Sequence, residues 1–205
     1  FLYIRMIFVL LVSLYSTRAI LNALGVVDYG IYNVVAGFVL MFAFLNSSMT
    51  NTIQRFFNFE RGNSNSDNLN KVYITSLQIQ ITLGIITVVL LEIIGIWYIN
   101  NKMVIPVDRI SAAMCVFQFS VISLFLLILQ IPYGAAVVAH EKMGFYAIVS
   151  MVDVILKLFI AFILPYIPYD RLIYYGIFML IISIANIFLY FVYAKKNFEE
   201  IRYHH

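Results

Sequence analysis

Six charge-poor stretches, each about twenty residues or longer, constrain what this chain can fold into. They cover about residues 1–24, 29–49, 72–99, 109–132, 143–164 and 172–194, with polar connections between them. An α-helix needs about 20 apolar residues to cross roughly 30 Å of hydrocarbon. Strands of a membrane barrel are shorter, about ten residues, and alternate apolar with polar side chains, which these stretches do not. The sequence therefore predicts an all-α, polytopic membrane protein, a single bundle of six transmembrane helices over residues 1–205.

Composition excludes several classes of protein. Hydrophobic residues make up 63% of the chain and charged residues only 11%, whereas about a quarter of a soluble domain is charged. The net charge of +3 comes from scattered basic residues, so we expect no nucleic-acid partner. The single Cys115 permits no thiol-based disulfide or metal cluster. With no Gly-rich phosphate loop, Cys/His cluster or Ser/His/Asp set, we expect no enzyme activity, no cofactor and no metal.

Local signals place two breaks between or within helices. Gly25 ends the first apolar stretch, and Asp28 is expected to cap the start of the second helix. Pro132 interrupts an uncharged run that is too long for one straight span, so the fourth helix is expected to end or kink near residues 130–134. The longest connection, 55–70, is expected to be a solvated loop.

Lysine and arginine residues are unevenly distributed between the two sides that six crossings define. One side carries eight and the other four. Because positive residues are retained on the cytoplasmic side, we expect the side with eight, and with it both ends of this chain, to be cytoplasmic. The eight are Arg5, Arg55, Arg61, Lys71, Lys142, Lys195, Lys196 and Arg202, and the four are Arg18, Lys102, Arg109 and Arg171.

Five segments spread over nearly the whole chain carry a family resemblance. They are Ser16-Thr17-Arg18, residues 24–33 from Leu24 to Asn33, Gln54-Arg55-Phe56, Gln130-Ile131-Pro132-Tyr133, and residues 139–143 from Ala139 to Met143. These segments resemble bacterial polysaccharide-biosynthesis flippases, also called oligosaccharide flippases. That group belongs to the multidrug/oligosaccharidyl-lipid/polysaccharide exporter superfamily.

The resemblance implies a function and a larger assembly. Such proteins have about twelve to fourteen helices in two lobes that rock around a central cavity, and this chain resembles the amino-terminal lobe. It would sit in the bacterial inner membrane and help flip a lipid-linked oligosaccharide for cell-surface polysaccharide synthesis, such as lipopolysaccharide. The implied partners are that cargo, membrane lipid and the second lobe. The implied energy source is an ion gradient, and a single lobe is not expected to transport by itself.

Two ionisable residues inside the fifth predicted helix need an explanation. A charge in a span costs about 2.5–3.5 kcal/mol on insertion scales. Asp153 and Lys157 are four residues apart, so they share a helix face and can pair. They are either a neutralised structural pair or part of a polar cavity wall that takes part in transport, and our hypothesis is the cavity wall.

Four further residues are candidates for the cavity. Arg18 either extends to the outer interface or grips an anionic diphosphate. Arg55 is a similar candidate on the cytoplasmic side, and Asn51 and Gln54 recur near it at helical spacing. These polar residues either contact a ligand or line the wet end of a helix.

The other polar residues receive structural assignments. Glu92 is expected to reach the interface or to pair with a basic neighbour, and Gln118, Gln130 and Asn186 to form hydrogen bonds between helices. The final His204 and His205 are either native or left over from cloning.

Two other functions remain open at this stage. The first is an ion-coupled multidrug or cation exporter of the same superfamily. Such exporters often carry a carboxylate in the first helix, whereas residues 1–24 contain no Asp or Glu and do contain Arg18. The second is a membrane scaffold without cargo, which is favoured if Arg18, Arg55, Asp153 and Lys157 face in unrelated directions.

Overall fold

The computed structural model describes residues 2–62, 66–198 and 201. Arg202, His204 and His205 lie outside this described part. Within it the chain is helical, with three short 3-10 turns, η1 (Met41–Ala43), η2 (Val107–Arg109) and η3 (Leu164–Tyr166). The α-helices are α1 (Leu2–Leu24), α2 (Val26–Leu40), α3 (Phe44–Gly62), α4 (Ser66–Asn101), α5 (Ile110–Ala139), α6 (Met143–Ile163) and α7 (Arg171–Asn197).

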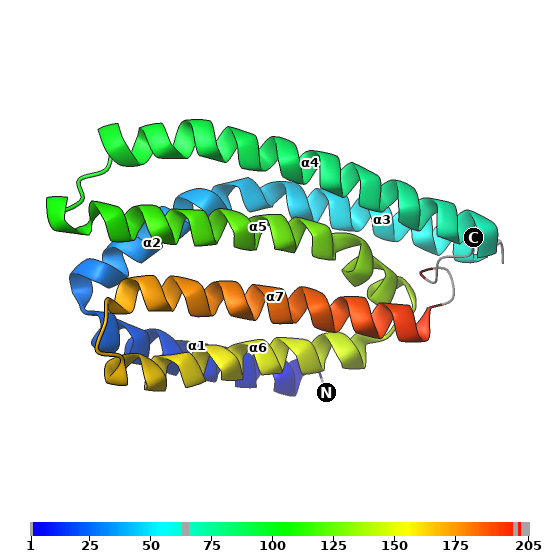
Figure 1. Cartoon of the computed structure of the whole chain (residues 1–205). Coiled ribbons are helices and arrows are strands. Elements are labelled where there is room, and N and C mark those ends of the chain that lie inside the picture. Colours follow the sequence, from blue (N-terminus) through cyan, green and yellow to red (C-terminus); the bar gives the residue numbers. More distant parts are fainter. Residues whose placement is uncertain (1, 63–65, 199–200, 202–205) are drawn as a thin grey trace.

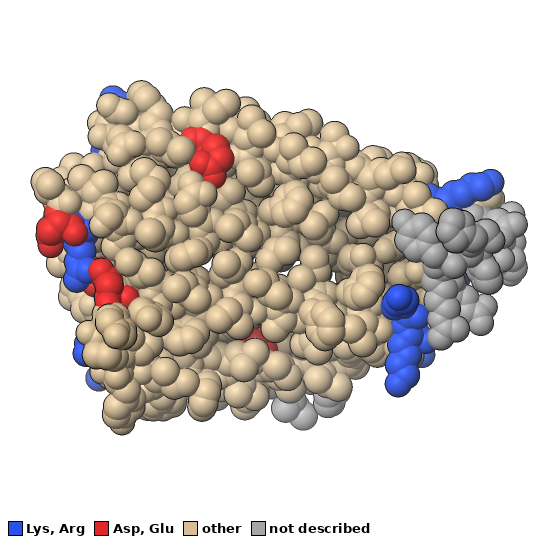
Figure 2. Space-filling view, viewed as in Figure 1, with Lys and Arg blue, Asp and Glu red and all other residues tan. Residues whose placement is uncertain are grey.

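Six helical segments in the described part are long and apolar enough to cross a membrane, which confirms the predicted all-α polytopic bundle. The segments run alternately in opposite directions, so the start of α1 and the end of α7 lie toward the same end (Figure 1). Charged side chains gather at the two ends of the visible face, and its middle is almost free of them (Figure 2). That uncharged band is what a hydrocarbon environment requires.

The second segment is longer than the sequence predicted. It covers 26–62 rather than 29–49, because α2 continues through η1 into α3. α3 is polar on one side, but Ile53 and Phe57, four residues apart, are both buried on the other. This amphipathic pattern keeps the chain helical after the uncharged run has ended. Most of the predicted loop 55–70 is therefore helix.

Pro132 does not end its helix. α5 continues through it to Ala139, where the backbone N–H of His140 donates to the Ala136 carbonyl at 3.0 Å. Figure 1 shows α5 bending toward α7 over its last turns. A bend is the expected effect of a proline that removes one helical hydrogen bond and crowds the preceding turn. Of the two expected outcomes, a kink agrees with the structure and an end does not.

Helix α5 is the central element of the bundle. It contacts α2, α3, α4, α6 and α7, whereas α1 packs mainly along α6 (Figure 1). The buried apolar residues form three clusters, one at the end of the bundle where α3, α5 and α7 finish and α4 begins, and two toward the opposite end. The latter two are a cluster of α2, α4 and α5 and a cluster of α1, α6 and α7. The described residues therefore form no single continuous core.

An ion-pair network joins the starts of α2, α5 and α7. Arg109 contacts Asp28 at 3.2 Å and Asp170 at 2.7 Å. Asp170 also caps α7 by accepting the backbone N–H of Leu172 at 3.1 Å. The expected capping role of Asp28 is wrong, because Gly25, at φ 82°, is the cap of α2 and Asp28 lies in its first turn. A glycine tolerates that positive φ without a steric penalty.

Glu92 has a different partner from the one expected. Its carboxylate accepts a hydrogen bond from the Gln118 amide at 3.1 Å, across the contact between α4 and α5. A charged acceptor inside a span needs a donor, and an amide on the neighbouring helix supplies it. The assignment of Gln118 to hydrogen bonding between helices is confirmed.

Candidate functional site

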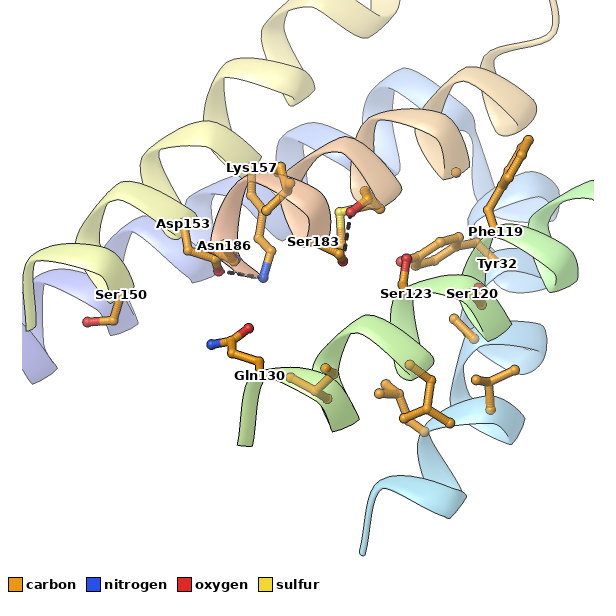
Figure 3. Close-up of a pocket in the computed structure, with 18 of the residues that line it drawn as sticks. Tyr32, Phe119, Ser120, Ser123, Gln130, Ser150, Asp153, Lys157, Ser183 and Asn186 are labelled. Atoms are coloured by element: carbon orange, nitrogen blue, oxygen red, sulfur yellow. Dashed lines mark hydrogen bonds and ion pairs between the residues drawn. The ribbon is translucent and has the colours of Figure 1, made fainter. Parts of the chain in front are cut away.

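A cavity of about 440 Å³ lies between α2, α5, α6 and α7. Residues of all three apolar clusters line it, among them Val39, Val149 and Ile182, so the cavity occupies the place where the clusters meet. α2 contributes Tyr32 and three aliphatic residues, whereas the other three helices contribute further polar groups among apolar ones (Figure 3). These polar residues are Ser120, Ser123, Gln130, Ser150, Asp153, Lys157, Ser183 and Asn186.

Helical spacing explains why these polar groups converge. On α6 the residues Ser150, Asp153 and Lys157 are three and four positions apart, which places them on one face. Ser183 and Asn186 are three apart on α7. Each helix presents a polar stripe to the cavity and keeps its other faces apolar, as a membrane-spanning helix with a buried polar function must.

Asp153 is the centre of a short hydrogen-bond network in the cavity wall. One carboxylate oxygen contacts the Lys157 Nζ at 2.7 Å, and the other accepts a hydrogen bond from the Asn186 Nδ2 at 2.8 Å (Figure 3). The predicted pairing of Asp153 with Lys157 is confirmed. The contact with Asn186 also ties α6 to α7. The side chains of Lys157 and Asp153 remain 37% and 21% exposed, so they face the hollow rather than a sealed core.

Arg5 of α1 reaches the same wall. Its Nη1 donates to the Ser150 Oγ at 3.4 Å, and its guanidinium carbon lies 4.9 Å from the centre of the Tyr146 ring. The Ser150 hydroxyl in turn donates to the Ala147 carbonyl at 2.8 Å. The Arg5 Nε is buried and has no hydrogen-bond partner in the described part of the chain. Arg5 therefore has one buried donor without a hydrogen bond, in a side chain that contacts the cavity wall at Ser150.

The charges around the cavity do not cancel. Arg5 and Lys157 contribute two positive charges and Asp153 one negative charge, which leaves +1. Among the residues that the structure describes, no carboxylate pairs with Arg5. A desolvated cation with a free N–H favours an anionic ligand, and a guanidinium can hold a phosphate through two hydrogen bonds.

The remaining predicted site residues lie elsewhere. Arg18 is exposed on α1, Arg55 and Asn51 are exposed on α3, and Gln54 is partly buried on α3. None of these four is among the residues that line the cavity. The structure thus brings Asp153 and Lys157 together and leaves the other candidates outside.

Sequence reasoning gave other roles to Arg5, which lies beside the cavity, and to two residues that line it. Arg5 was counted as a charge at the inner interface, although it is level with Ser150, seven residues or about 10 Å into α6. Its position within an uninterrupted apolar stretch was a signal of burial. Gln130 and Asn186 were assigned to hydrogen bonding between helices. Asn186 does bond to Asp153, but both residues also line the cavity.

The described residues contain no group of three or more His, Cys, Asp or Glu side chains that could hold a metal ion. The cavity lining combines hydroxyl, amide and paired ionic groups with aliphatic and aromatic side chains. Such a lining suits an amphiphilic ligand with a polar, anionic part. Comparison of the chain with family models, curated proteins and solved structures gives no match.

Proposed function

We propose that this chain is part of a membrane transporter that moves an anionic lipid-linked oligosaccharide across the bacterial inner membrane for cell-surface polysaccharide synthesis. The observation that carries the proposal is the cavity between α2, α5, α6 and α7, whose lining combines polar and apolar side chains and which, together with the adjacent Arg5, has a net charge of +1. A diphosphate-linked sugar on a polyprenyl chain has matching parts. It carries negative charge, hydroxyl groups and a hydrocarbon tail.

The paired charges in the cavity favour weak binding of a ligand that passes through, rather than tight binding of a ligand that stays. Asp153 neutralises Lys157, and the serine hydroxyls and Gln130 offer hydrogen bonds to a sugar without fixed charge. Transport requires a ligand to be held weakly enough to leave on the other side. The resemblance to flippases supplies the rest of the proposal: a second lobe, an ion gradient as energy source and cytoplasmic ends.

Binding of the lipid diphosphate alone tests the role of the cavity charge. We expect Arg5→Gln to weaken the binding of undecaprenyl diphosphate to the protein in nanodiscs by about ten-fold, because one charge-assisted contact is lost. Arg18→Gln is the matched control, since it removes the same charge from the same helix outside the cavity. Fluorescence titration measures both. Equal affinities for the two variants, or no measurable binding by the unaltered protein, would contradict the proposal.

Asp153 also gives a reason to consider a cation exporter. It places a carboxylate in the cavity wall, although Lys157 neutralises it. If this function holds, the protein binds a lipophilic cation such as tetraphenylphosphonium, and Asp153→Asn abolishes that binding. The lipid-diphosphate proposal expects no saturable binding of the cation. The same titration therefore separates the two functions.

A scaffold without cargo has one observation in its favour. Arg18 and Arg55 are exposed and do not share the cavity with Asp153 and Lys157, so the four charges do not all converge. Against a scaffold stands the cavity itself, since an assembly partner needs no polar hollow with an incompletely bonded Arg5 beside it.

A further inference from the structure

A second hollow lies outside the cavity, on the face of the bundle that α4, α5 and α7 share. It is a groove of about 340 Å³ whose lining includes Leu77 and Ile81 of α4, Tyr133 of α5, and Ile184, Phe188 and Phe191 of α7. The α7 residues of this groove and those of the cavity lie on different faces of the helix. The groove is therefore a separate feature, and the proposed function makes no use of it.

The groove has the shape and the lining of a site for a hydrocarbon chain. Ile184 and Phe191 are seven residues apart on α7, which gives the groove a length of about 10 Å along the helix. Tyr133 is buried, and its ring centre lies 5.8 Å from that of Phe191, so these aromatic rings form one end. An apolar groove on a membrane-spanning face is filled by lipid, since water has no hydrogen-bond partners there.

A basic residue stands at that same end. Lys195 follows Phe191 by one helical turn, about 6 Å along α7, and its Nζ lies 5.7 Å from the centre of the Phe191 ring. It belongs to the last turn of α7, next to Lys196, and blue side chains mark this end of the visible face (Figure 2). A cation one turn beyond an apolar groove lies at the depth of a lipid phosphate when the acyl chain occupies the groove.

We propose that the groove between α4, α5 and α7 binds one anionic phospholipid, with an acyl chain along Ile184 and Phe188 and the phosphate at Lys195. The charge of Lys195 distinguishes this ligand from a zwitterionic lipid of the same chain length. One lipid molecule can contact both the apolar residues and the lysine, because they lie on one side of α7. These residues, spaced three and four apart, are Ile184, Phe188, Phe191 and Lys195.

Native mass spectrometry of the purified protein tests the headgroup contact. The protein is titrated with phosphatidylglycerol and with phosphatidylcholine of identical acyl chains. We expect tighter binding of phosphatidylglycerol and a loss of about five-fold in its affinity for Lys195→Gln, the change that corresponds to roughly 1 kcal/mol per basic residue at an anionic membrane surface. Lys196→Gln is the matched control, because it removes the same charge one residue away from the groove face. Equal losses in the two variants would overturn the proposal.

A second pair of variants tests the groove itself. Ile184→Trp fills the groove and is expected to remove the tightly bound lipid of either headgroup, whereas Leu189→Trp places the same ring on another face of α7 and leaves binding unchanged. Ile184 and Leu189 are 49% and 39% exposed, and Leu189 lines neither the groove nor the cavity. If Ile184→Trp leaves the lipid count intact but alters the fraction of dimer, the groove is a contact between copies of the protein and the proposal fails.

Discussion

At the residue scale, Asp153 and its two partners are not equivalent. The carboxylate receives hydrogen bonds from Lys157 on its own helix and from Asn186 on α7. Removing the lysine leaves the carboxylate without its counter-ion but still with the amide donor of Asn186. Removing the carboxylate leaves the ammonium group without its counter-ion and removes the charged acceptor that links α6 to α7. Either loss leaves one uncompensated charge in a span, but the carboxylate keeps a hydrogen-bond donor whereas the ammonium group loses its carboxylate acceptor, so the two losses differ.

This asymmetry gives an ordered prediction for three variants. Asp153→Asn is expected to lower the free energy of unfolding most, by about 1–3 kcal/mol, and Lys157→Met to lower it less, because Asn186 still donates to the carboxylate. The double variant Asp153→Asn with Lys157→Met is expected to be more stable than Asp153→Asn alone, since no unpaired charge remains. Denaturant titration in one detergent measures all three.

The double variant also separates structure from transport. If the pair serves only to lock α6 to its neighbours, a full-length protein that carries the double substitution transports as well as the unaltered protein. The cavity-wall hypothesis requires transport to fall even where stability is restored. Equal transport would therefore remove these two residues from the proposed function while leaving the ordering of stabilities intact.

The sequence predicted the contacts of the site that stay within one helix and missed those that cross between helices. The Asp153 and Lys157 pair follows from a spacing of four residues. The contact of Arg5 with Ser150 joins residues 145 positions apart, and that of Asn186 with Asp153 joins residues 33 apart. No local pattern encodes which helices become neighbours, so these partners emerged only with the tertiary packing.

At the element scale, the close approach of α4 and α5 depends on a glycine. A Cβ added at Gly95 would lie closer than 3.0 Å to the ring of Phe117, which is fully buried and has no space to move. Small residues allow helix backbones to approach closely in membranes, where packing rather than hydrophobic burial drives association. Glycine is therefore needed at position 95 because the Phe117 ring leaves no room for a Cβ atom, and not because the backbone has a positive φ there.

Substitution of this glycine should destabilise the bundle. We expect Gly95→Ala to lower the free energy of unfolding by about 1–3 kcal/mol through overpacking. Gly37→Ala is the control, because nothing lies within 4 Å of its added Cβ and alanine favours helix by about 0.5–1 kcal/mol. The expected signs are opposite in the same unfolding titration.

A compensating change identifies the cause. Adding Phe117→Leu to Gly95→Ala shortens the side chain that clashes, so the double variant should be more stable than the sum of the single changes predicts. If the effects of the two substitutions simply add, the cost of Gly95→Ala comes from something other than contact with Phe117.

Boundaries between elements were harder to predict than the elements themselves. Pro132 is a helix breaker by local rules, yet neighbouring helices bury the residues around it and the helix continues as a bend. In α3, the polar composition concealed an apolar face that carries Ile53 and Phe57. In both places tertiary packing overrode a local preference. The six apolar crossings, in contrast, follow from length and hydropathy alone.

At the scale of the whole molecule, the structure refines the charge count that orients the bundle. Arg5 lies beside the cavity wall and Arg202 lies outside the described part, so neither counts as a described charge at the end predicted to be cytoplasmic. Six basic residues remain near that end and three near the other, and Arg18 lies within α1. The six are Arg55, Arg61, Lys71, Lys142, Lys195 and Lys196, and the three are Lys102, Arg109 and Arg171.

The remaining bias still predicts cytoplasmic ends, and the single cysteine makes this simple to test. In a Cys115→Ala background, a cysteine at Val104, in the exposed connection between α4 and α5, should react with a membrane-impermeant maleimide in intact cells. A cysteine at Gly62, exposed at the end of α3, should react only after the cells are permeabilised. Both positions tolerate the new side chain, because Val104 is fully exposed and nothing lies within 4 Å of a Cβ at Gly62.

The labelling pattern has consequences for the charged groups of the bundle. If Val104→Cys is labelled outside, the network of Arg109 with Asp28 and Asp170 lies at the outer surface, and the phosphate proposed at Lys195 belongs to a lipid of the inner leaflet. A reversed pattern would place Lys195 outside and contradict the orientation from the charge bias. Labelling of both cysteines in intact cells would mean that α4, the segment between them, does not cross the membrane. The number of spans would then be odd, which contradicts the prediction that the two ends of the chain lie on the same side.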